Sequence, residues 1–347
     1  MTGSATELFG IKVPIVLGPF GGVSSVELAA AVSNAGGLGS YGLYGYTAER
    51  IRETAAQLRA VTDEPFNLNL WWPTGDEVEP HDIDWAEATA RVAPFYAEAG
   101  LDLPPRPERF LPSFSEQLEA VIAARPAVAS FVFGVPDADA IAALHDAGTR
   151  VVGTATNVAE ARALAAGGVD AIIASGMEAA GHRVTFIGEA EDSLVGTFAL
   201  VPQVVDAVDV PVLAAGGVAD RRGVAAARAL GASGVVVGTA FLATAESAAP
   251  PSHRAAIRQV AQSGTRLTRA MSGRLARGIE NDAMRELEAA GYARFPAQNM
   301  LTGGFRAAAA RRNDASRLSL WAGQAAPLAV GATAAEVFDE LAAGLTP

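Results

Sequence analysis

Cysteine is absent from this 347-residue chain, and lysine occurs once, at Lys12. The absence of cysteine excludes disulfides, thiolate metal sites and cysteine nucleophiles. Neither an HExxH zinc pattern nor a GxSxG nucleophile elbow is present. Any chemistry that the protein performs must therefore use other groups, and we predict no metal site.

Positive charge is also scarce. The chain has 26 lysine and arginine residues against 38 aspartate and glutamate residues, so its net charge is -12. Such a charge opposes binding to nucleic acid and to anionic membranes, and neither partner is expected. No apolar run reaches transmembrane length, and the first residues lack a basic start followed by an apolar core. These observations predict a cytoplasmic protein.

Short β-branched runs alternate along the chain with alanine-rich stretches that are typical of helices. This alternation favours a parallel sheet with crossover helices. Several helical stretches begin at Ser, Thr, Asp or Asn and end at Gly, which are preferred cap residues. Eight strands are predicted, at residues 13–18, 37–42, 66–71, 127–134, 150–155, 170–175, 210–215 and 234–239.

Eight such units within roughly 240 residues fit a TIM (β/α)8 barrel, which typically needs about 250 residues. We predict that the barrel spans residues 1–246, and a doubly wound open sheet is the alternative. Residues 72–112 are rich in proline, acid and aromatics, which indicates an insertion after the third strand, at the barrel mouth. Residues 247–347 are predicted to form a helical extension packed on the barrel. Whether the insertion moves as a lid stays open.

The turns after strands seven and eight are candidates for ligand binding. In this fold a phosphate site commonly follows these two strands. Here the strands end in AAGGVAD, residues 214–220, and in VVGTAF, residues 236–241. Their glycines allow backbone N–H groups to approach a phosphate, and Thr239 adds a hydroxyl. The alternative is that the glycines only form tight turns, but the pair in this order favours a phosphate-bearing ligand.

Two other segments face the same mouth. The first turn, GPFGGVSS at residues 18–25, allows close approach of a planar ligand, although a glycine-rich turn alone is weak evidence. In the third strand, alternation places Asn67 and Asn69 on one face, which is the barrel interior. An inward amide must be hydrogen-bonded, either within the core or to a ligand, and the residues alone slightly favour the core.

His182 follows the sixth strand in ASGMEAAGHRVTF, residues 174–186, and therefore faces the same mouth. A histidine there can bind a substrate or cofactor and can transfer a proton near neutral pH. A solvated histidine at a loop edge is the alternative. The other three histidines, His81, His145 and His253, are predicted to lie on the surface.

The chain resembles the nitronate monooxygenase family, formerly called 2-nitropropane dioxygenases, in GPFGGVSSVELAAAVSNAGGLGSYG, FNLNLW, VVGTATNVAEARALAAGGVDAIIASGMEAAGHR, VPVLAAGGVADRRGVAAARALGASGVVVGTAFL and SGRLARGI. A weaker likeness continues through FPAQNML and LSLWAGQAA. The resemblance implies a TIM barrel that binds FMN non-covalently, with His182 in the active site. It assigns to the flavin Gly21, Gly22, Asn69, Ser175, Ala180, Gly181, Gly216, Gly217, Val236, Val237, Gly238 and Thr239.

The resemblance further implies oxidation of alkyl nitronates by molecular oxygen to carbonyl compounds and nitrite. The chain departs from the family pattern in places. The family often has Gln at the positions of Ser175 and Val236, Gly at that of Ala180, and GHRG where this chain has GHRV. The two missing amides would be hydrogen-bond partners of the flavin, so a different tuning of its redox behaviour is implied.

Two other functions remain open. An FMN-dependent enoyl-thioester reductase or acyl-CoA dehydrogenase of the same barrel group would use the insertion and the extension to hold a long acyl substrate. A non-redox barrel enzyme would use only the phosphate site, but Lys12 precedes the first strand, at the wrong end for a Schiff base. The alanine-rich helices can support a homodimer, although no self-complementary patch is evident in the sequence.

Overall fold

The computed structural model describes residues 4–261 and 264–345. Neighbouring parallel strands follow the order β1-β9-β8-β6-β5-β4-β3-β2, and a parallel bridge between Val16 and Leu38 closes the barrel. The TIM-barrel prediction is confirmed, and all eight predicted strands are present: β1 (Ile15–Leu17), β2 (Gly39–Gly42), β3 (Phe66–Trp71), β4 (Val128–Val132), β5 (Arg150–Ala155), β6 (Ala171–Ser175), β8 (Val212–Ala215) and β9 (Gly234–Val237).

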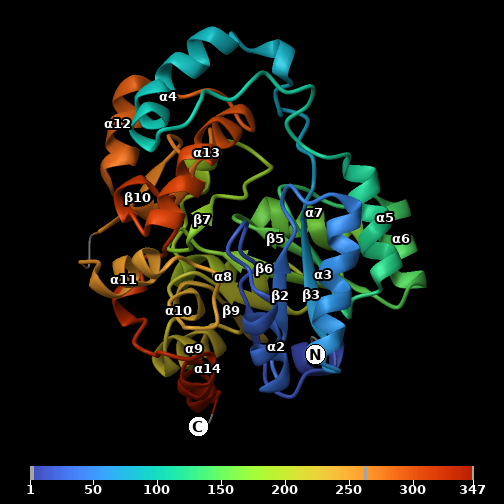
Figure 1. The fold of residues 1–347 in the computed structure, drawn as a ribbon. Coiled ribbons are helices and arrows are strands. Elements are labelled where there is room, and N and C mark those ends of the chain that lie inside the picture. The colour runs from blue at the N-terminus through green and yellow to red at the C-terminus, as the bar shows by residue number, and fades with distance from the viewer. Residues whose placement is uncertain (1–3, 262–263, 346–347) are drawn as a thin grey trace.

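Helices surround the strands as an outer layer (Figure 1). Most of them begin at a polar cap, as where the Asp137 side chain accepts a hydrogen bond from the Ala140 N–H at 2.8 Å. Such caps satisfy backbone donors that a helix leaves unpaired. The layer contains α2 (Val26–Asn34), α3 (Ala48–Val61), α5 (Phe114–Ala124), α6 (Ala138–Asp146), α7 (Val158–Gly167), α8 (Thr197–Val205), α9 (Arg221–Ala229) and α14 (Ala334–Ala342).

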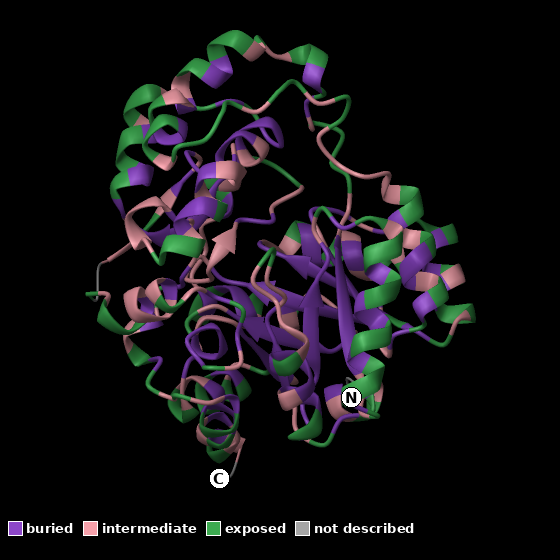
Figure 2. Cartoon of the chain, viewed as in Figure 1, coloured by how far each residue is buried: buried purple, intermediate pink, exposed green. Residues whose placement is uncertain are grey.

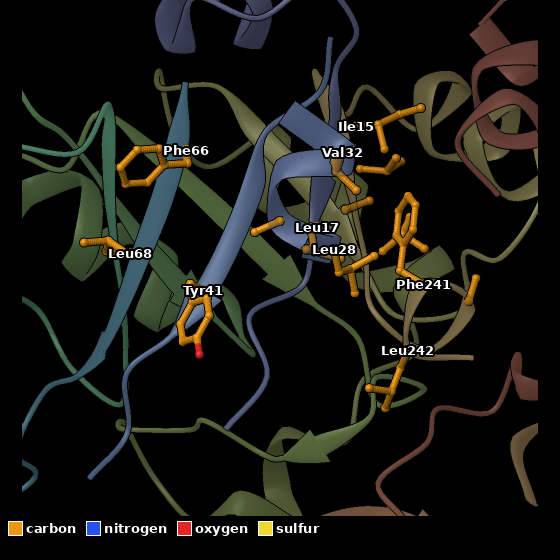
Figure 3. Close-up of a cluster of buried hydrophobic side chains, with 14 of the residues drawn as sticks. Ile15, Leu17, Leu28, Val32, Tyr41, Phe66, Leu68, Phe241 and Leu242 are labelled. Carbon is orange, nitrogen blue, oxygen red and sulfur yellow. The ribbon is translucent and has the colours of Figure 1, made fainter. Parts of the chain in front are cut away.

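The main hydrophobic core lies between the barrel and these helices, and the strands are almost wholly buried (Figure 2). Outward-pointing Leu17 of β1 and Leu68 of β3 belong to one buried cluster with Leu28 and Val32 of α2 (Figure 3). Each fully buried aliphatic side chain of this kind stabilises the fold by about 1.5–3 kcal/mol. This core holds the strand ends in fixed positions for a site at the mouth.

The barrel interior changes character from its N-terminal end to its C-terminal end. At the N-terminal end, α1 (Ala5–Phe9) closes the barrel, and Phe9 shares a buried cluster with Val16 and other inward-facing strand residues. Nearer the mouth the interior is polar, because Asn67 donates from Nδ2 to Ser40 Oγ at 3.1 Å and to Ser130 Oγ at 2.9 Å. Packing therefore fills the lower barrel, while small polar groups line the upper part.

Two segments far apart in the sequence form a cap over the mouth (Figure 1). Helices α4 and α13 pack together, and the rings of Phe95 and Phe305 stack with centroids 4.9 Å apart. Strand β11 pairs antiparallel with β10 and with β7, which immediately follows the barrel strand β6 along the chain. The cap comprises η1 (Pro80–Asp82), α4 (Trp85–Ala99), β7 (Gly181–His182), β10 (Thr265–Thr268), β11 (Ala276–Ile279), α12 (Asp282–Ala290) and α13 (Ala297–Arg312).

The C-terminal segment does not lie wholly in the cap. Helix α14 packs against α2 and α9, so the chain returns to the barrel after forming the cap. The division into domains at residue 246 remains a prediction. Within the described ranges, no helix is long and apolar enough to cross a membrane. The remaining short elements are η2 (Ala190–Ser193), α10 (Thr239–Leu242), α11 (Pro251–Gln259), η3 (Ala315–Arg317), η4 (Ala326–Leu328) and η5 (Ala343–Leu345).

Candidate active site

A cavity of about 380 Å³ lies at the C-terminal mouth of the barrel, with walls from both the strand ends and the cap. Of the predicted site residues, Val237 does not reach it. Alternation along β9 turns Val236 toward the barrel interior, whereas Val237 is fully buried against the helices. The other predicted site residues line the cavity together: Gly21, Gly22, Asn69, Ser175, Ala180, Gly181, His182, Gly216, Gly217, Val236, Gly238 and Thr239.

Glycines at the ends of β8 and β9 form one wall of this cavity. Gly216 and Gly217 have φ angles of 96° and 75°. Residues other than glycine rarely adopt this backbone conformation. A Cβ atom on Gly216 would also lie 3.0 Å from the backbone nitrogen of Ala179. Thr239 accepts a hydrogen bond from the Gly323 N–H at 3.0 Å, which leaves its own hydroxyl hydrogen available. The wall therefore exposes backbone and one hydroxyl to a ligand.

The floor of the cavity consists of inward-facing strand residues. Asn69 donates from Nδ2 to the backbone oxygen of Ser130 at 3.1 Å and to its Oγ at 3.0 Å. Its Oδ1 has no partner among the described residues, and this atom can accept a hydrogen bond from a ligand. Ser175 and Val236 contribute short side chains without an amide. Asn69 is therefore the amide that the floor offers.

His182 lies on β7, where it pairs with Ala276 of β11. Its Nε2 is 2.8 Å from Ser272 Oγ, and its ring packs against Trp71 and Trp321 at centroid distances of 4.9 and 5.6 Å. Burial, together with the nearby charges of two arginines, lowers the pKa of His182 to about 3. The imidazole is therefore neutral at physiological pH.

Those two arginines are Arg274 and Arg306, and both belong to the cap. The guanidinium of Arg274 lies 4.6 Å from the ring centroid of Phe133 and forms ion pairs with Asp76 and Glu77. Arg306, on α13, forms no ion pair with a carboxylate in the described part of the chain. It donates to Ser319 Oγ and to two oxygens of Asn299, each at 2.8 Å. Its positive charge is therefore uncompensated beside the cavity.

Burial lowers the pKa of Arg306 to about 10, which still leaves the guanidinium charged at neutral pH. Its Nε is buried and has no hydrogen-bond partner. Arg306 is half-buried, and a cation that is partly removed from water without a counter-charge is stabilised when an anion pairs with it. The arrangement therefore favours an anionic ligand.

Two further arginines hold the loop that carries His182. Arg183 is almost fully buried and donates to the backbone oxygens of Gly176 at 2.7 Å and Ser175 at 2.9 Å. Arg277 of β11 donates from Nε to the backbone oxygen of Met177 at 2.8 Å. These bonds satisfy the carbonyls of a loop that has little regular structure, and they hold its backbone in place.

Several residues that shape the cavity were not assigned a role from the sequence. They are Tyr44, Trp71, Phe295, Arg306 and Trp321. The segments FPAQNML and LSLWAGQAA contain two of them, and the family resemblance in those segments was the available signal. Only the fold brings their side chains to the barrel mouth.

The prediction that His253 lies on the surface is wrong. Its side chain is 2% exposed, and Nε2 is 3.0 Å from the backbone oxygen of Trp321. The reason is that α11, which carries His253, packs against η3 and η4, which flank Trp321. The histidine is therefore buried at this contact, although the sequence around it is polar. His81 and His145 are exposed as predicted.

A closed barrel whose C-terminal mouth holds a cavity, lined by a half-buried histidine and an uncompensated arginine, defines a TIM-barrel enzyme with a site suited to a small anion. The chain belongs to the nitronate monooxygenase family, whose profile matches residues 3–344. A nitronate monooxygenase of Pseudomonas aeruginosa is 40% identical to this chain over 98% of both sequences.

Two solved structures are also similar to this chain. Nitroalkane oxidase from Streptomyces ansochromogenes shares 38% identity and a TM-score of 0.86 over 98% of both chains. FabK from Thermotoga maritima shares 30% identity and a TM-score of 0.77, over 99% of this chain and 96% of its own. The likeness covers the cap as well as the barrel in both comparisons.

Proposed function

We propose that this protein is an FMN-dependent oxidoreductase that oxidises alkyl nitronates with molecular oxygen, giving carbonyl compounds and nitrite. Membership of the nitronate monooxygenase family supports this reaction. The observation that carries the proposal is the cavity itself, where neutral His182 and uncompensated Arg306 face glycine-rich strand ends. FabK is less similar and does not favour the reductase alternative.

The residues of the cavity fit FMN. Its volume of about 380 Å³ lies within the range of about 300–1,000 Å³ that is usual for cofactor and ligand sites. Gly216, Gly217 and Thr239 would hold the phosphate. The two glycines have no side chain that would keep a ligand away from the backbone, and the hydroxyl hydrogen of Thr239 is free to donate. Asn69 would accept a hydrogen bond from the flavin ring through Oδ1.

One carboxylate also borders the cavity, and its bonding shows why it would not repel the phosphate strongly. Glu178 accepts hydrogen bonds from the Thr197 backbone N–H at 2.9 and 3.0 Å and from the Thr197 hydroxyl at 2.9 Å. The carboxylate is therefore directed at the first residue of α8 and is neutralised in part by that helix end.

When bound, FMN would supply the electron-transfer chemistry between the nitronate and oxygen. The protein supplies binding and electrostatics. The positive charge of Arg306 favours the anionic nitronate over the neutral nitroalkane, because the cavity wall screens charge less than water does. Neutral His182 contributes one N–H donor to the anion. The rings of Trp71 and Trp321 exclude water and so strengthen these polar contacts.

The test is an absorption spectrum of the purified protein before and after anaerobic addition of propyl-2-nitronate. Flavin bands that bleach with the nitronate, and recover when oxygen is admitted, are the expected result. Flavin bands that respond to a reduced nicotinamide but not to the nitronate would overturn the proposed substrate. A protein that binds no flavin when FMN is added would overturn the cofactor.

A further inference from the structure

The turn between β10 and β11 carries a serine that touches His182. Ser272 is 1% exposed, and its Oγ is 2.8 Å from His182 Nε2. Helix α13 holds this turn, because Gln298 donates to the Ala270 oxygen at 2.6 Å and Thr302 donates to the Met271 oxygen at 2.8 Å. These hydrogen bonds hold the backbone of the turn in place and so fix the position of Ser272 beside the histidine.

The bonds of the Ser272 hydroxyl can be counted. The Arg274 N–H donates to Ser272 Oγ at 3.3 Å and occupies one lone pair. The single hydroxyl hydrogen then has two acceptors in reach, the Arg274 oxygen at 3.2 Å and His182 Nε2 at 2.8 Å. Oγ keeps a second lone pair, so the 2.8 Å separation fits a hydroxyl that donates to Nε2 as well as an Nε2–H that donates to Oγ. When the hydroxyl donates, Nε2 carries no proton, and the preference of a bound anion for a facing N–H selects this arrangement.

The other nitrogen of the ring must then carry the proton. Burial and the charges of two nearby arginines keep His182 neutral, so one of its nitrogens is protonated and the other is not. Nδ1 has no hydrogen-bond partner among the described residues, and the ring lines the cavity. An N–H at this position suits an anion, whereas a lone pair would repel it.

We propose that Ser272 is a positioning residue that fixes His182 as the Nδ1–H tautomer and so aims its N–H donor at the anionic substrate. This inference rests on the proposed function, because it gives His182 a contact with the nitronate. It goes further by assigning the proton to one nitrogen and by naming the group that places it there.

The direct test is the tautomer itself. Nitrogen NMR of the flavin-loaded protein, labelled with 15N in its four histidines, separates protonated from unprotonated ring nitrogens. The His182→Asn spectrum identifies the His182 signals. We expect Nδ1–H in the wild-type protein, and a mixture of tautomers or Nε2–H in Ser272→Ala. Nε2–H in the wild-type protein would overturn the proposal without the need for any Ser272 variant.

Kinetics supply a second readout. Ser272→Ala should lower kcat/KM for propyl-2-nitronate by about 10- to 100-fold, because a misplaced contact to the reacting group has costs of this order. Ser272→Thr keeps the hydroxyl and should recover most of the loss. The matched control is Ser33→Ala. Ser33 is also a fully buried serine, but it donates to the backbone oxygen of Pro65 at 2.7 Å and lies outside the cavity.

Ser33→Ala should lower stability without changing the tautomer of His182 or kcat/KM. Failure of this inference can be told apart from failure of the proposed function. If His182→Asn keeps full turnover, the proposed role of the histidine fails, whatever its tautomer. If His182→Asn loses turnover while Ser272→Ala keeps both the wild-type tautomer and kcat/KM, the role of Ser272 is overturned and that of His182 stands.

Discussion

At the scale of single residues, the environment of His182 differs from that of a surface histidine, because its ring packs against Trp71 and Trp321. Burial and the charges of Arg274 and Arg306 keep the His182 ring neutral. In such a site one hydrogen bond from a neutral N–H to an anion is worth more than in water, because little solvent competes for it. The same arginine charges that hold the ring neutral also attract the nitronate.

Replacing His182 with Asn should remove this contact and leave the cofactor in place. We expect turnover with propyl-2-nitronate to fall by about 100-fold or more, in the range usual for loss of a group that contacts the reacting atoms. Flavin absorbance of the purified variant should match the wild type. Steady-state kinetics would show the loss, and unchanged kcat and KM would contradict the proposed role.

His253 gives a prediction about pH and stability. Burial lowers its pKa to about 4, below the value of 6.5 of an unperturbed histidine. The unfolded chain therefore takes up a proton between pH 6.5 and 4 while the folded chain does not, and the free energy of unfolding falls as pH falls through this window. His182 acts in the same direction. Above pH 6.5 both states are neutral and the contribution is complete.

His253→Gln should make the fall in stability between pH 7 and 4 shallower, because one of these two protonation steps is gone. Urea denaturation at several pH values measures the slope. His81→Gln is the control, since it replaces an exposed histidine and leaves His253 and His182 in place. A slope unchanged by His253→Gln would show that this histidine is not buried in the neutral form.

At the scale of elements, the contact between α4 and α13 joins the two segments of the cap, and adjacent glycines in α13 differ in what surrounds them. A Cβ on Gly304 would lie 2.4 Å from the Tyr96 hydroxyl oxygen, and Tyr96 donates to the Leu301 oxygen at 2.9 Å. A Cβ on Gly303 would meet only the end of Arg306, at 4.0 Å. Close helix packing therefore requires glycine at 304 and not at 303.

Both Gly→Ala changes gain about 1 kcal/mol of helix propensity, but only Gly304→Ala overpacks the contact with α4, which typically costs about 1–3 kcal/mol. We therefore expect Gly304→Ala to be less stable than Gly303→Ala by about that overpacking cost. Urea denaturation of the pair measures the difference directly. Equal stabilities would mean that the two cap helices are not packed as closely as the structure describes.

At the scale of the whole molecule, a chain of net charge -12 surrounds a site whose uncompensated charge is positive. Acidic groups lie mainly on the exterior, whereas the buried arginines Arg183 and Arg277 and the half-buried Arg306 lie around the mouth. The electrostatic potential inside the cavity therefore differs from the average potential at the protein surface. The cavity also lies between barrel and cap, so a ligand there binds both parts of the fold.

If FMN binds in this cavity as proposed, its removal should lower the melting temperature, because a ligand that binds only the folded state stabilises it. At a free FMN concentration of 100 times Kd the stabilisation is about 2.7 kcal/mol. Thermal unfolding of the flavin-free protein, with and without added FMN, measures it. Riboflavin, which lacks the phosphate, should stabilise less at the same concentration, and equal effects would contradict the phosphate site.

Sequence reasoning predicted the barrel well, because its evidence is local. Strand and helix patterns repeat over short stretches, and caps and turns are formed by neighbouring residues. The same logic brought His182, Asn69 and the strand-end glycines to one mouth, since parallel strands of a closed barrel all end on the same side. The side chain of Val237 does not line the cavity, because a contiguous motif ignores the alternation that turns every second side chain of a strand away from the barrel interior.

What the sequence alone determined is therefore the barrel, the end at which its site lies and the strand-end residues that face it. The tertiary structure alone decided which residues cover that site. Ser272 meets His182 across 90 positions of the chain, and Arg306 reaches the cavity from a helix after the last barrel strand. No local pattern specifies such contacts, because they arise only when distant segments pack together and exclude water from the groups between them.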